Sequence, residues 1–176
     1  MATARSFSRS AIAEDDERNR NQQKTYGKGL SSVPHVKDTF AKQNSKMSKR
    51  YMNSGLVVYK KLSPNHSGQR THSIDRITPH CVVGQWSAEE LGDWFAKSSI
   101  QASSNYGIDR DGRVALYVEE KNRSWCSSSN ANDQRAVTIE CASDTSEPYA
   151  FRDVVYRKLN TLCVDICKRN GKKKLI

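Results

Sequence analysis

The sequence predicts an α/β fold in which a mixed β-sheet is flanked by helices and preceded by a basic, largely irregular N-terminal arm. Three observations support this prediction. Short apolar, β-branched runs alternate with two amphipathic helical patterns over residues 52–176. Residues 1–51 are poor in large apolar residues and carry eleven Lys and Arg against five Asp and Glu. The length of 176 residues fits one domain with an appendage.

The arm, residues 1–51, cannot bury enough apolar surface to offset the entropy cost of ordering its chain. We therefore expect it to be extended or disordered, with a short helix around residues 11–23 only when a partner is present. Its positive charge leaves two roles open, a solvated leader and a contact with an anionic wall polymer, nucleic acid or lipid headgroup. Nucleic acid is the least favoured partner, because few aromatic residues are available for base stacking: Phe7, Tyr26, Phe40 and Tyr51.

Targeting signals and cysteine spacing give further expectations. Residues 1–13 include Arg5 and Arg9 and lack the unbroken apolar stretch of a secretory signal. No apolar run approaches the roughly 18 residues that span a bilayer, so we expect synthesis in a cytoplasm and no transmembrane segment. The five cysteines are odd in number and show neither framework nor C-x-x-C spacing, which favours free thiols over disulfides or a structural zinc cluster.

Five apolar runs in the domain are typical of short strands. They are Gly55–Tyr59, Ile77–Val83, Tyr106–Ile108, Arg113–Val118 and Ala136–Cys141. Pro79 removes a ladder donor from the second run and therefore favours a sheet edge or a bulge there. The Asp-Gly pair at residues 111–112 separates the third and fourth runs and predicts a hairpin. Turn chemistry over Ser63–Gly68 predicts a loop after the first run.

Two segments are predicted to be helices. Ser87 and Glu90 have capping-box spacing, and apolar residues follow at helical intervals to about Lys97. A second helix is expected from about Pro148 to Asn170, with apolar positions at helical spacing and Gly171 as a candidate C-cap. A polar loop through residues 127–133 precedes the last strand. A further strand is expected after the last helix.

Three polar residues on these strands are candidate site residues. His80 lies in an apolar strand, Tyr106 precedes a hairpin turn, and Glu140 ends the last strand. Each has an ordinary structural interpretation: a satisfied strand histidine, a packed hairpin aromatic and an exposed carboxylate. Together they are the parts of a metal hydrolase site, which needs a neutral imidazole ligand, a general base and an oxyanion donor.

The domain resembles the zinc-dependent N-acetylmuramoyl-L-alanine amidases of the type-2 kind, which share their fold with peptidoglycan recognition proteins and many phage endolysins. Five segments in family order carry the resemblance: Arg76–Gly84, Ser87–Leu91 with Trp94 and Phe95, Ala102–Gly112, Tyr117–Cys126 and Asn130–Glu140. The segment Lys60–His72 is similar to endolysins in particular. The resemblance implies an amidase or peptidoglycan-recognition-like sheet over residues 52–176.

The resemblance also implies a role for each candidate residue. His80 corresponds to the family's first Zn²⁺ ligand, and Glu140 to the acidic residue that acts as general base. Tyr106 falls where some members have a tyrosine near the oxyanion. Trp125 and Asn105 are expected to bind substrate. Zn²⁺ is the implied cofactor and bacterial peptidoglycan the implied partner.

The sequence also departs from the family pattern. The second histidine and the third ligand of the family follow the last helix, so we expect residues 52–176 to lack the last strand and the C-terminal ligands. Four side chains are candidate substitutes: His66, His72, Cys81 and Cys126. The resemblance favours ligands outside this chain over a site rebuilt from these four, because a lone imidazole does not hold zinc.

The expected function is peptidoglycan hydrolysis at the amide between N-acetylmuramic acid and L-alanine, as in cell-wall lysis by phage enzymes. The isolated chain is expected to be weakly active or inactive. The alternative is a non-catalytic peptidoglycan-binding module of a virion or larger assembly. In either case the site of action is the cell wall, reached after phage-mediated release.

Overall fold

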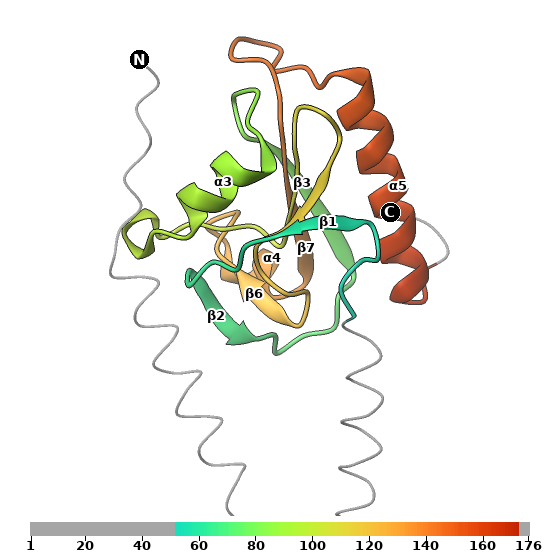
Figure 1. Ribbon diagram of the computed structural model, residues 1–176. Coiled ribbons are helices and arrows are strands. Elements are labelled where there is room, and N and C mark those ends of the chain that lie inside the picture. Colours follow the sequence, from blue (N-terminus) through green and yellow to red (C-terminus); the bar gives the residue numbers. More distant parts are fainter. Residues whose placement is uncertain (1–51, 173–176) are drawn as a thin grey trace, which may run out of the picture. The chain divides into compact units, whose positions relative to one another are not determined.

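The computed structural model describes residues 52–172, and the predictions for the arm lie outside this part of the chain (Figure 1). Its centre is a five-stranded sheet in the order β1-β5-β4-β7-β3. The strands are β1 (Val57–Lys60), β3 (Arg76–Cys81), β4 (Tyr106–Ile108), β5 (Val114–Leu116) and β7 (Ala136–Cys141). Only the β4–β5 hairpin is antiparallel, so the predicted mixed sheet is confirmed. The strand that contains Pro79 lies at the sheet edge, as its missing N–H predicts.

A small antiparallel ribbon and a short helix differ from the prediction. The ribbon pairs β2 (His66–Gln69) with β6 (Asn122–Ser124), and α4 (Asn130–Asp133) lies in the predicted polar loop. Both strands are polar, so they carry no hydrophobic alternation that predicts a strand. The segment around Ser63–Gly68 was predicted to be a loop, and its second half is instead held by backbone pairing.

Two longer helices complete the domain, together with a 3₁₀ turn at Ser98–Ile100. Helix α3 (Ala88–Phe95) begins with the predicted capping box, in which the Ser87 side chain accepts from the Glu90 N–H and the Glu90 carboxylate accepts from the Ser87 N–H. Helix α5 (Asp153–Arg169) begins five residues later than predicted. Residues 144–150 form a turn instead, closed by the Asp144 N–H on the Ala150 carbonyl, and Tyr149 has a φ of 55°. No helix within residues 52–172 has the length and hydropathy of a membrane span.

The two helices cover opposite faces of the sheet (Figure 1). The larger core packs α5 against β4, β5 and β7, with Ile108, Ile139 and Leu162 almost fully buried. The second core packs α3 on the other face, against Ala115 and Tyr117. Small residues are required under α3, because a Cβ on Gly107 would lie 2.5 Å from the Tyr117 ring.

A buried ion pair fixes the C-terminal end of α5. Glu120 is fully buried, and its carboxylate accepts two hydrogen bonds from the Arg169 guanidinium, at 2.9 and 2.6 Å. The Tyr106 hydroxyl donates to the same carboxylate at 2.5 Å and accepts from the Ser54 N–H at 2.8 Å. This network joins the helix, the middle of the sheet and the segment before β1.

We predict that Arg169→Met lowers the free energy of unfolding by about 3–5 kcal/mol, because it leaves the buried Glu120 carboxylate without its cation. Chemical denaturation measures the change. Arg157→Met is the matched control, since Arg157 is an exposed arginine on the same helix and its replacement should cost well under about 1 kcal/mol. An equally small effect at Arg169 would contradict the structural role of the pair.

Candidate metal centre

The pairing of β3 with β7 brings two of the predicted site residues together. The strands are parallel, and His80 is the register partner of Glu140. Register partners in neighbouring parallel strands point to the same face of a sheet, and alternate residues point to opposite faces. Since Ile139 lies in the core beneath α5, His80 and Glu140 belong to the other face, which α3 partly covers.

A third donor comes from the loop after β6. Cys126 is held there by Asp133, a buried carboxylate at the end of α4. Asp133 accepts from the Cys126 N–H at 3.1 Å and from the Ser127 hydroxyl at 2.5 Å. Asp133 therefore anchors the loop at Cys126. The Cys126 thiol points toward the sheet and lies 3.6 Å from Glu140 Oε1.

Burial raises the pKa values of Glu140 and Cys126 in this cluster. The His80, Cys126 and Glu140 ligand atoms all lie within 4.8 Å of one another, and each residue is partly buried. Burial raises the pKa of Glu140 to about 7, opposed by the hydrogen bond from Cys126. Burial, followed by the nearby Glu140 and Asp133 charges, raises the pKa of the Cys126 thiol above its ordinary value. Raised pKa values favour the protonated forms of Cys126 and Glu140, and a metal ion that binds them would displace those protons.

The donor set fits zinc. Thiolate sulfur, imidazole nitrogen and carboxylate oxygen are the three ligand types that Zn²⁺ uses in proteins. Catalytic zinc sites take three protein ligands and leave one position open, which matches the number of donors here. Within residues 52–172, His80, Cys126 and Glu140 form a group of side chains close enough together to hold a metal ion.

Tyr106 lies apart from the cluster. It is the register partner of Ile139, so it points to the α5 face, and its side chain is fully buried. Its hydroxyl donates to the Glu120 carboxylate and accepts from the Ser54 N–H. Burial raises the pKa of Tyr106 well above its ordinary value. The structure therefore places Tyr106 on the opposite face of the sheet from His80 and Glu140.

The two predicted substrate-binding residues have different surroundings. Asn105 is fully buried, and its side chain accepts from Arg70 at 2.8 Å and donates to the Val118 carbonyl at 3.2 Å. Its amide joins buried segments and has no surface to offer a substrate. Trp125 is half-buried and directly precedes Cys126, with its indole N–H on the Ser67 hydroxyl at 2.7 Å. Only Trp125 keeps a position from which it can line a site.

Of the four candidate substitute ligands, the structure places Cys126 in the cluster. His66 is in β2, where its Nδ1 accepts from the Gly68 N–H, and His72 is exposed in the following loop. Cys81 follows His80 directly, so it points to the opposite face of β3. Sequence reasoning named Cys126 but had no pattern that placed it, because a contact between a loop and two strands depends on the tertiary fold.

The chain is similar to a known protein family and to several solved structures. Residues 70–175 match a family described as N-acetylmuramoyl-L-alanine amidase. A selenomethionine AmpD derivative aligns with a TM-score of 0.56 and 17% identity, over 68% of this chain and 78% of that one. A mutant endolysin from Bacillus subtilis aligns with a TM-score of 0.53 and 14% identity, over 65% of this chain and 77% of that one. PlyL aligns with a TM-score of 0.51 and 13% identity, over 65% of this chain and 75% of that one. No curated protein matches significantly. These structural likenesses confirm the predicted fold.

We predict that the metal-free protein loses stability as the pH rises from about 4.5 to about 7. The pKa of Glu140 is raised from 4.5 to about 7 in the folded state, so over this range the unfolded chain releases a proton that the folded chain keeps. The loss should reach roughly 3 kcal/mol, measured by denaturation in chelator at several pH values. Glu140→Gln should flatten the profile and the exposed Glu147→Gln should not. A profile unchanged by Glu140→Gln would show that this carboxyl titrates normally.

Proposed function

The chain belongs to the N-acetylmuramoyl-L-alanine amidase family, which cleaves the amide between N-acetylmuramic acid and L-alanine in peptidoglycan, and on this premise we propose that a zinc ion held by His80, Cys126 and Glu140 serves that reaction here. The single observation that supports the proposal is the convergence of these three donors from β3, β7 and the loop after β6. The family assignment supports the reaction, and the three converging donors support this location for it.

Zinc, when bound, supplies a Lewis acid for the scissile carbonyl and lowers the pKa of water toward neutrality. The chain's own residues prepare the place for it. Asp133 holds the Cys126 loop through two N–H groups, those of Cys126 and Ser127, and so fixes the thiol before any ion arrives. The β3–β7 pairing fixes His80 against Glu140 in the same way. Such preorganisation keeps a site from depending on loop motion.

Two roles are open for Glu140. The number of donors favours a ligand, because catalytic zinc takes three protein ligands. A pKa near 7 favours proton transfer as a general base, which works best when its pKa lies close to the working pH. We propose that Glu140 is a zinc ligand. The alternative is the general-base role expected from the sequence, and measuring bound zinc in a Glu140 variant distinguishes the two roles.

The substrate contacts outside the cluster are also part of the proposal. Trp125 is half-buried beside Cys126 and offers an apolar ring to a sugar or peptide next to the scissile amide. The arm, residues 1–51, has the charge to contact an anionic wall polymer. Release of a phage-type enzyme onto the cell wall is the proposed route to the substrate.

We predict that one cobalt ion replaces zinc and gives a near-ultraviolet charge-transfer band from a thiolate ligand. Cys126→Ser should abolish the band, and His80→Ala should lower the metal stoichiometry well below one. Cys167→Ser is the control, since Cys167 is a half-buried thiol on α5 away from the cluster, and it should leave the spectrum unchanged. A band that survives Cys126→Ser would remove Cys126 from the ligand set.

We predict that the zinc-loaded chain releases L-alanine stem peptides from purified peptidoglycan and that a chelator abolishes this release. Glu140→Ala should lower both zinc content and turnover. Zinc retained with turnover reduced about 10²-fold or more would instead assign the general-base role. Wall binding without turnover, in a chain shown to hold zinc, would favour a non-catalytic peptidoglycan-binding module over the enzyme.

A further inference from the structure

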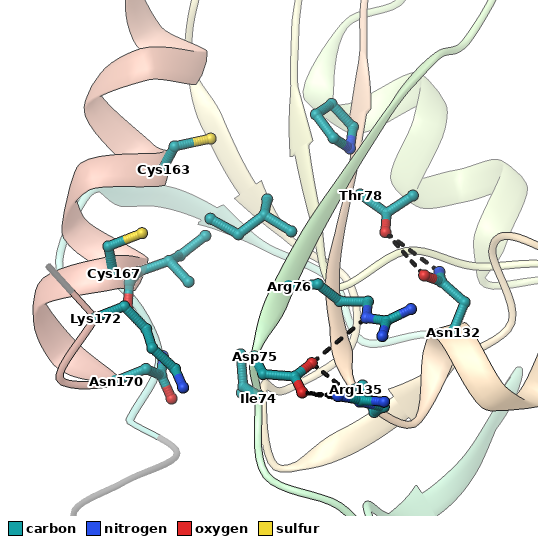
Figure 2. Close-up of a pocket in the computed structure, with 13 residues that line it drawn as sticks. Ile74, Asp75, Arg76, Thr78, Asn132, Arg135, Cys163, Cys167, Asn170 and Lys172 are labelled. Atoms are coloured by element: carbon teal, nitrogen blue, oxygen red, sulfur yellow. Dashed lines mark hydrogen bonds and ion pairs between the residues drawn. The ribbon is translucent and has the colours of Figure 1, made fainter. Parts of the chain in front are cut away.

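Two hollows of the domain differ in size and place. A groove of about 750 Å³ lies between β3 and α5 and is lined by none of the three metal donors (Figure 2). A shallow hollow of about 250 Å³ lies at the start of α3, where Gln85 and Trp86 of the loop after β3 meet Glu90 of the first helical turn. Because that loop continues the strand that carries His80, the smaller hollow is connected to the candidate metal centre.

Two tryptophan side chains adjoin the smaller hollow. Trp86 lines it, and Trp94, on α3, has a relative exposure of 44%. Their ring centroids lie 6.1 Å apart at an interplanar angle of 60°, so the edge of one ring faces the other. The Lys97 ammonium lies 5.4 Å from the centroid of the Trp94 ring. We call Trp86, Trp94 and Lys97 the tryptophan patch, and contiguous exposed aromatic surface of this kind marks a binding site more often than isolated exposed side chains do.

The loop between β3 and α3 holds the tryptophan patch in a fixed position. Val83 has a φ of 53°, a conformation in which a β-branched residue is strained. The Val83 N–H donates to the Ser143 hydroxyl at 3.1 Å, and the Ser143 N–H donates to the Gly84 carbonyl at 3.0 Å. The Trp86 indole rests on the loop backbone, since a Cβ on Gly84 would lie 2.5 Å from the indole nitrogen. The surrounding structure therefore maintains a strained loop, as at sites whose shape is preorganised for a ligand.

The same contacts connect the tryptophan patch to the candidate metal centre. Ser143 follows β7, the strand that carries Glu140, and the loop follows β3, the strand that carries His80. Val82 points to the same face of the sheet as His80, and it packs with Trp86 against the core beneath α3. The two strands that supply metal donors therefore also set the position of the patch, on the same side of the sheet.

The chemistry of the amidase substrate identifies the occupant. A sugar lies on one side of the scissile amide and a peptide on the other, so both lie beside the metal centre when the amide does. Tryptophan rings suit the CH-lined face of a sugar ring, and polar side chains at their edges suit its hydroxyl and N-acetyl groups. Glu90 supplies an acceptor and Lys97 supplies donors. These two side chains have opposite charges, which favours an uncharged sugar over a charged peptide.

We propose that the tryptophan patch binds the sugar chain of the substrate, a run of N-acetylated amino sugars that leads to the metal centre. The proposal rests on the proposed amidase function and adds which part of the substrate lies along α3. Trp86 and Trp94 stack on sugar rings, and Lys97 and Glu90 bind the groups at the ring edges. These side chains determine specificity, because they touch the substrate away from the amide that is cleaved.

The probe for the test is chitotetraose, the tetramer of N-acetylglucosamine, which carries neither a stem peptide nor the scissile amide. Binding to the full chain is followed in a chelator by NMR of the indole N–H signals. The chain has three tryptophans, so three signals are expected, and Trp→Phe variants assign them to Trp86, Trp94 and Trp125. The tripeptide L-alanyl-γ-D-glutamyl-L-lysine represents the peptide side of the amide. Since no metal or turnover is involved, a failure of the amidase function would not alter this result.

We expect chitotetraose to shift the Trp86 and Trp94 signals saturably and the tripeptide to leave them unchanged. Trp94→Ala should weaken chitotetraose binding at least about tenfold, because it removes an aromatic anchor, and Trp94→Tyr should recover most of the binding. The control is Tyr156→Ala, which removes an exposed aromatic ring from α5 and should bind like the unmodified chain. In the zinc-loaded chain, Trp94→Ala should raise KM for polymeric peptidoglycan with kcat nearly unchanged.

Three results would overturn the proposal. A shift of the Trp125 signal alone would place the sugar chain at Trp125. Equal shifts of the Trp86 and Trp94 signals by the tripeptide would assign the patch to the stem peptide. The absence of a saturable shift with chitotetraose would remove the sugar chain from the patch, whether or not the zinc-loaded chain cleaves peptidoglycan.

Discussion

The register between β3 and β7 is the constraint on which the candidate site depends. These parallel strands align His80 with Glu140 and, one residue later, Cys81 with Cys141. A slip of one residue would move each side chain to the opposite face of the sheet. The imidazole would then point toward the core under α5 and the cluster would lose its first donor. Register is well specified here because the alternate residues of β7 are buried in that core.

The buried polar side chains around this pairing hold the loops rather than the substrate. Asn105 connects β7 to the turn at Glu119 through Thr138 and several backbone carbonyls. Arg70 reaches the same amide and also the Asp133 carbonyl, so the chain just after β2 is tied to α4, the helix that positions Cys126. Such networks are costly when one member is missing, which makes them rigid supports. The candidate metal centre is therefore carried by a polar framework.

Much of the fold could be predicted because its signals are local. The capping box at Ser87, the Asp-Gly hairpin and the apolar run of β7 each identify one element from neighbouring residues. The ribbon of β2 and β6 could not be predicted, since polar strands carry no alternation. In the site, His80 and Glu140 were named from a motif, whereas the position of Cys126 follows from Asp133 and the tertiary fold. The face that Tyr106 occupies is likewise set by its register with Ile139, which no local pattern in the sequence encodes.

Pro79 has a consequence for the behaviour of the protein at high concentration. An unprotected sheet edge can template the growth of intermolecular β-sheet, and natural proteins interrupt such edges with proline and charged side chains. β3 has both, with Pro79 in its second half and Arg76 at its first residue. One missing N–H shortens the continuous ladder that a neighbouring chain can form. Together, the missing N–H of Pro79 and the charge of Arg76 disfavour the open-ended stacking that leads to fibrils.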